Sequence, residues 1–178
     1  NKHIGGSWLL TTSNFGRNLY IGNHQGASGF YEPMQPGRGH AWFEQEDDTA
    51  IAENAAGRKL SPAEVSAYWT GEAMDFIKTR PGQWLALMIR KLALFFNNIE
   101  IADTEDLYSY SEQSGILKTA DYVFSFGVLL PAAVCGIYLT RGRRQELALL
   151  YLLLAGYTAS VVIFYVFGRY RYPAVMLL

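Results

Sequence analysis

Two long uncharged segments in the C-terminal third of the chain constrain its fold more than any other feature. Residues 122–140 form a run of 19 residues without a charged side chain, and residues 147–168 form a second run of 22. Each run approaches the roughly 20 apolar residues that a helix needs to cross a hydrocarbon layer about 30 Å thick. We therefore predict two full transmembrane helices. The alternative is a buried helical hairpin in a soluble core, which a chain of 178 residues would cover with difficulty.

A basic turn over residues 141–146 joins the two predicted transmembrane helices. Its three arginines place it in the cytoplasm under the positive-inside rule. The opposite ends also carry three cations, Lys118, Arg169 and Arg171, so charge alone leaves the orientation open. Residues 169–178 predict a second turn followed by the start of a truncated third transmembrane helix. The fold class we expect is mainly α, as a fragment of a helical integral membrane protein.

Residues 1–121 hold most of the ionisable groups, and we predict a mostly helical and irregular region there. Residues 1–37 show no persistent helical or strand period, which indicates loops with short elements. Residues 41–56 are rich in helix formers and are followed by Gly57, a common residue after a helix end. Ser61 and Glu64 have the spacing of a capping box, which predicts a helix over about 62–80.

A second helix is predicted over about 81–97, where an apolar pattern is interrupted by Arg90 and Lys91. Two charges at mid-length argue against a transmembrane helix. The helix lies either in the membrane interface or in the core of the polar region, and the residues leave both open. A short capped helix is also expected from Asp103 to Gly115.

Several function classes lack their usual signatures in this sequence. The net charge of −1 lacks the excess of basic residues that is typical of nucleic-acid-binding proteins. Cys135 is the only cysteine, which rules out an internal disulfide or a cysteine metal cluster. The motifs of phosphate loops, dinucleotide sites and zinc proteases are missing. His40 and Glu44 have helical spacing, which we interpret as a surface pair. We predict no cofactor and no metal-binding residues, and the sequence leaves a metal requirement of the enzyme open.

The most informative polar motif is GRYRYP at residues 168–173, after the second uncharged run. Arg169 and Arg171 can bind a phosphate through paired charged hydrogen bonds at the depth of lipid headgroups. The alternative is that they anchor a helix end at the membrane interface. Three asparagines near the N-terminus are candidates for sugar contacts or for structuring loops: Asn14, Asn18 and Asn23.

Three segments together resemble the C-terminal half of bacterial membrane glycosyltransferases similar to the dolichyl-phosphate-mannose protein mannosyltransferases. They are TTSNFGRNLYIGNHQGASGFYEP (11–33), AAGRKLSPAEVSAYWTGEAMDFIKTRPGQWLALMIRKLALFFNNIEI (55–101) and FGRYRYPAVMLL (167–178). The resemblance implies an enzyme of the bacterial inner membrane that moves a sugar from a polyprenyl-phosphate donor to a protein, lipid or glycan acceptor. It also implies that residues 1–121 are extracytoplasmic.

The same resemblance implies inverting displacement at the sugar, with an acidic base in an earlier extracytoplasmic loop. No catalytic residue is therefore expected in this fragment, and Arg169 and Arg171 are the expected donor-phosphate contacts. Two other classes remain open from the residues. A transporter subunit would usually place ionisable groups within its transmembrane helices, and these runs contain none. A membrane-anchored binding or sensor protein would fold residues 1–121 as a separate domain.

Overall fold

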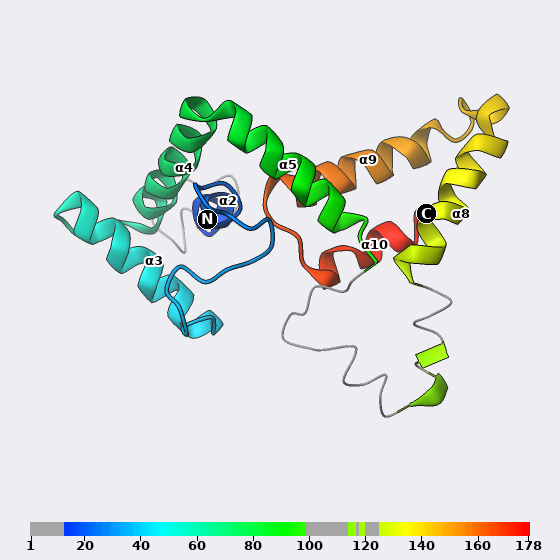
Figure 1. Cartoon of the computed structure of the whole chain (residues 1–178). Coiled ribbons are helices and arrows are strands. Elements are labelled where there is room, and N and C mark those ends of the chain that lie inside the picture. The colour runs from blue at the N-terminus through cyan, green and yellow to red at the C-terminus, as the bar shows by residue number, and fades with distance from the viewer. Residues whose placement is uncertain (1–12, 99–113, 117, 120–124) are drawn as a thin grey trace, which may run out of the picture. The chain divides into compact units, whose positions relative to one another are not determined.

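The chain is mainly α-helical, as predicted. The computed structural model describes residues 13–98, 114–116, 118–119 and 125–178 (Figure 1). Its backbone divides into two compact units, Asn1–Met88 with Ile163–Tyr165, and Ile89–Val162 with Val166–Leu178. The helices are α2 (Phe15–Gly22), α3 (Ala41–Ala56), α4 (Pro62–Thr79), α5 (Pro81–Phe95), α8 (Phe126–Leu139), α9 (Ala148–Ile163) and α10 (Tyr172–Val175), with 3-10 turns η1 (Arg141–Arg143) and η2 (Gly168–Tyr170). Helix α5 runs from the first unit into the second.

Helices α2, α3 and α4 form the body of the first unit, with α2 and α3 both contacting α4. The predicted capping box of α4 is confirmed, because Ser61 Oγ accepts from the Glu64 amide at 3.4 Å and Glu64 Oε2 accepts from the Ser61 amide at 2.8 Å. The predicted helix over 41–56 is also present as α3, and Gly57 follows it with a left-handed φ of 67°. Ala52, Val65 and Trp69 form one buried cluster between these helices.

Helix α2 is a regular element in a region where the sequence showed no period. Two of its glycines lie where other backbone segments approach. A Cβ atom added to Gly16 would lie 1.9 Å from the Ser66 carbonyl oxygen, and one added to Gly22 would lie 1.7 Å from the Phe164 carbonyl oxygen. These two glycines therefore allow close packing of this helix.

The two uncharged runs form shorter helices than predicted. Helix α8 has 14 residues and α9 has 16, so the expectation of a full helix over 147–168 is wrong in length, whereas residues 122–124 of the predicted helix over 122–140 lie outside the described residues. At 1.5 Å per residue they extend about 21 Å and about 24 Å. Within the described residues, no helix combines the length and the apolar character that crossing a membrane requires. Helix α9 ends at Ile163, and the Ile163 carbonyl, which has no partner within the helix, accepts from Asn23 Nδ2 at 2.7 Å.

The second unit has an apolar core at the C-terminal end of α5. Phe95, Val161, Val166 and Ala174 are buried together. On the same helix Lys91 is fully buried, whereas Ile89 and Leu92 are exposed. The helix predicted from Asp103 lies largely outside the described residues.

Candidate functional site

Arg171, one of the two predicted phosphate ligands, is almost completely buried in the second unit. Its Nε donates to the Phe95 carbonyl at 2.9 Å, its Nη2 donates to the Asn97 carbonyl, and its guanidinium carbon lies 4.0 Å from the centre of the Phe126 ring. Cations commonly satisfy the last carbonyls of a helix in this way. Arg171 thus holds the C-terminal segment against the end of α5, and its contact with a phosphate stays a prediction.

Arg169, the other predicted ligand, is exposed in the turn η2. Its guanidinium carbon lies 5.1 Å from the Phe167 ring centre and 5.3 Å from the Tyr170 ring centre. The turn itself is fixed by Tyr157 Oη, which donates to the Tyr170 carbonyl at 2.8 Å. The structure therefore presents one arginine of the GRYRYP motif at the surface, beside two adjacent aromatic rings, and buries the other.

Asn23 is buried, and both ends of its side-chain amide have protein partners. Its Nδ2 donates to the Leu19 carbonyl at 2.8 Å and to the Ile163 carbonyl, and its Oδ1 accepts from Trp84 Nε1 at 3.0 Å. A buried amide with these bonds holds backbone segments together. This geometry favours the interpretation of Asn23 as a structural asparagine.

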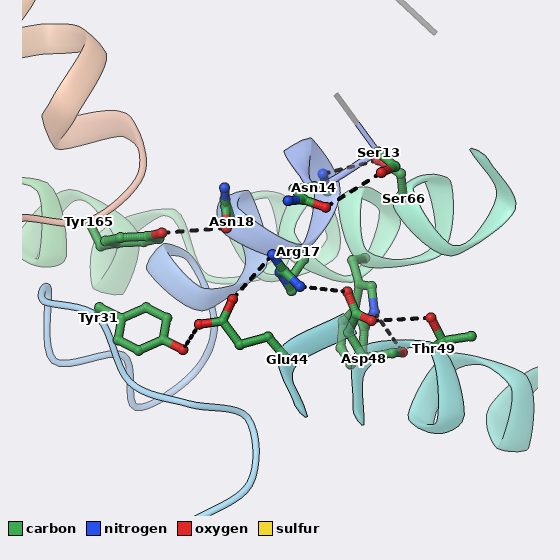
Figure 2. A network of polar contacts seen from close by, with 12 residues as sticks. Ser13, Asn14, Arg17, Asn18, Tyr31, Glu44, Asp48, Thr49, Ser66 and Tyr165 are labelled. Carbon is green, nitrogen blue, oxygen red and sulfur yellow. Dashed lines mark hydrogen bonds and ion pairs between the residues drawn. The ribbon is translucent and has the colours of Figure 1, made fainter. Parts of the chain in front are cut away.

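Asn14 and Asn18 lie one turn apart at the start of α2 (Figure 2). Asn14 is exposed and Asn18 is half-buried. Asn18 Oδ1 accepts from Tyr165 Oη at 3.4 Å, and Asn14 Oδ1 accepts from Ser13 Oγ at 3.5 Å. Their contact with sugar hydroxyls remains a prediction.

A buried ionic network in the first unit was missed by the sequence reasoning. Arg17 Nη2 lies 3.3 Å from Glu44 Oε2, and Arg17 Nη1 lies 3.4 Å from Asp48 Oδ2. Tyr31 Oη donates to Glu44 Oε1, so the contacts run in a line from Tyr31 to Asp48 (Figure 2). Burial raises the pKa of the Asp48 carboxyl, although Arg17 acts to lower it. Burial and the bond to Glu44 likewise raise the pKa of Tyr31.

This network joins α2 to α3 and makes Glu44 more than the surface residue that we predicted. A signal for it was present, because Glu44 and Asp48 are four residues apart and so share one face of α3. A buried arginine needs such partners, since an unpaired buried charge is costly. The two carboxylates bind the guanidinium of Arg17, which suits a structural role better than the binding of an anionic ligand.

Lys91 is a second buried cation, and its ammonium lies within the second unit. Burial lowers the pKa of Lys91 to about 7. The sequence reasoning had treated Lys91 only as a charge that interrupts an apolar pattern. The structure instead buries this side chain within the second unit.

Comparison with known proteins identifies no relative of this chain: no protein-family model, no curated protein and no solved structure matches it. The functional assignment must therefore come from the chain's own residues and from the resemblance described above.

Proposed function

We propose that the chain is part of a membrane glycosyltransferase that moves a sugar from a polyprenyl-phosphate donor to a protein, lipid or glycan acceptor. In this proposal Arg169 contacts the donor phosphate, and the catalytic acidic residue lies outside the chain. The proposal places the protein in the bacterial inner membrane, with residues 1–121 on the extracytoplasmic side. It rests on the three segments of the resemblance and on one structural observation, the exposure of Arg169 beside an apolar helix.

The position of Arg169 matches the chemistry of a lipid-linked phosphate. Such a donor combines a long apolar chain with an anionic head, and the second unit exposes both apolar side chains and a cation. Helix α9 exposes Leu149, Leu152 and Leu153, and Arg169 follows this helix in the turn η2. The planar guanidinium forms paired hydrogen bonds with phosphate, and the flanking aromatic rings limit its freedom to move.

The exposed apolar residues of α8 support a membrane location within the same proposal. Val134, Ile137 and Leu139 are all exposed, so this helix presents an apolar surface as α9 does. Large exposed apolar side chains gathered on one helix often contact lipid or another protein. Neither helix contains Asp, Glu, His, Lys or Arg, which favours a transferase over a transporter subunit.

Sugar transfer in membranes containing the protein tests the proposal. The assay follows a radiolabelled sugar from a polyprenyl-phosphate donor to acceptor, with Arg169→Gln and Arg169→Lys compared with wild type. We expect Arg169→Gln to lower kcat/KM by about 100-fold and Arg169→Lys to lower it less, because a point charge retains part of the attraction. Arg144→Gln, at an exposed arginine in the basic turn, is the matched control. Unchanged transfer by Arg169→Gln would refute the assigned contact.

A further inference from the structure

The first unit contains a pocket of about 240 Å³ between the end of α2, residues 32–34, α3 and α4. Its polar lining residues are Tyr20, His24 and Glu32, and its apolar lining includes Ile51 and Trp69. Typical pockets for drug-sized ligands measure about 300–1,000 Å³, so this one suits a compact ligand. An apolar wall with a few polar groups is the usual composition of a small-molecule site.

The hydrogen bond of His24 defines which ring nitrogen can accept a hydrogen bond from a ligand. His24 Nδ1 lies 3.1 Å from the Tyr20 carbonyl oxygen. A carbonyl oxygen only accepts, so Nδ1 carries the hydrogen, and in the neutral ring Nε2 is the acceptor. The ring also stacks on Tyr20 with centroids 5.1 Å apart, which fixes its orientation.

Among the described residues that line the pocket, Glu32 contributes a carboxylate and none is a lysine or an arginine. Burial raises the pKa of the Tyr20 phenol, and the nearby carboxylate of Glu72 raises it further, so Tyr20 stays neutral. An anionic ligand such as a phosphate would be repelled here, whereas a cation would be attracted.

We propose that this pocket binds a compact ligand that carries a primary ammonium group. An ammonium has three N–H donors and no acceptor. The residues that line the pocket carry three acceptors, namely the Glu32 carboxylate, Nε2 of the neutral His24 ring and the Tyr20 hydroxyl oxygen. The Trp69 indole is held in place by its Nε1, which donates to the Asp48 carbonyl at 3.1 Å, and aromatic rings add attraction for a cation.

The proposal does not depend on sugar transfer or on Arg169. The pocket lies wholly within the first unit, and its argument uses only the lining groups. A loss of transfer activity would therefore leave this inference standing, and a failure to bind an amine would leave the proposed transferase function standing.

Isothermal titration calorimetry of the full 178-residue chain in detergent micelles tests the inference, with D-glucosamine and D-glucose as probes. The two sugars have the same ring, and the first replaces one hydroxyl by an ammonium. We expect saturable binding of glucosamine and at least about tenfold weaker binding of glucose, the ratio that about 1.4 kcal/mol produces. Equal binding of both sugars would mean a pocket for neutral hydroxyl groups and would overturn the proposal, as would no binding of glucosamine.

A pair of carboxylate variants locates the binding. Glu32→Gln is expected to weaken glucosamine binding about tenfold, because the neutral amide loses the charge-assisted contact. Asp75→Asn makes the same chemical change at an exposed residue that does not line the pocket, and we expect it to bind as wild type does. Glu32 is itself exposed, so its replacement leaves the fold intact, which circular dichroism checks. Equal affinities of the two variants would place the amine elsewhere and refute the site.

Discussion

Replacing Gly16 by alanine is expected to destabilise the first unit, although alanine is the better helix former. The reason is the contact between α2 and α4. A Cβ atom at Gly16 would lie 1.9 Å from the Ser66 carbonyl oxygen and 2.7 Å from its carbonyl carbon, whereas ordinary contact begins at 3.4 Å. Both atoms belong to backbone, so the helices would have to separate by more than an ångström.

The expected change in the free energy of unfolding combines two destabilising contributions and one stabilising contribution. Overpacking of this kind costs about 1–3 kcal/mol. Separation also weakens the bond from the Gly16 amide to Ser66 Oγ, now 3.1 Å long, which contributes about 0.5–1.5 kcal/mol. Alanine in a helix gains back about 0.5–1 kcal/mol over glycine. We expect a net loss of about 2 kcal/mol in the free energy of unfolding.

Gly71→Ala is the matched control, because Gly71 is an exposed helical residue of α4 with nothing within 4 Å of an added Cβ. It should stabilise the chain by about 0.5–1 kcal/mol. The assay is urea unfolding of the full chain in detergent micelles, followed by circular dichroism. The two variants should change stability in opposite directions. A Gly16→Ala protein as stable as wild type would refute the close approach of α2 and α4.

Three further predictions concern buried polar groups. Arg17→Met leaves the carboxylates of Glu44 and Asp48 without their cation and should lower the free energy of unfolding by about 3–5 kcal/mol in the same urea assay; wild-type stability would contradict the network. Asn23→Ala leaves several buried polar groups unpaired and should lower the free energy of unfolding by about 1–3 kcal/mol. The same change at an exposed residue, Asn54→Ala, should leave the free energy of unfolding unchanged. Burial lowers the pKa of Lys91 to about 7 in the folded chain, whereas an exposed lysine has a pKa of about 10.4. Between about pH 7 and pH 10 the unfolded chain therefore binds one more proton than the folded chain, and the free energy of unfolding should rise with pH. Lys91→Met should flatten that rise, and an equal slope in both proteins would disprove the assignment.

Local signals in the sequence were sufficient for α3 and α4, although not for α2. Ser61 and Glu64 determine where α4 begins through bonds within one turn, and Gly57 follows α3 with the expected left-handed backbone. Such signals depend on neighbours in sequence, so they can be read without the fold. The extent of the apolar helices could not be read in this way. Helix α9 stops at Ile163, whose carbonyl bonds to Asn23, a residue 140 positions away.

The candidate site shows the same division. Residue type identified the arginines of GRYRYP, but only the structure separates exposed Arg169 from buried Arg171, because the difference arises from the carbonyls of Phe95 and Asn97. The pairing of Arg17 with Glu44 and the amine pocket likewise depend on segments that are distant in sequence. Charge and spacing could identify single residues or pairs on one helix, and only packing shows which distant residues they contact.

Binding of a polyprenyl monophosphate to the full chain tests the central claim most directly, with the matching polyprenol as the comparison. Both lipids have the same apolar chain, so their difference in Kd reports the phosphate contact alone. The account predicts that the monophosphate binds at least about tenfold more tightly, and that Arg169→Gln removes this difference while Arg144→Gln preserves it. Equal affinity of the two lipids, or a preference for the phosphate that survives Arg169→Gln, would contradict the account.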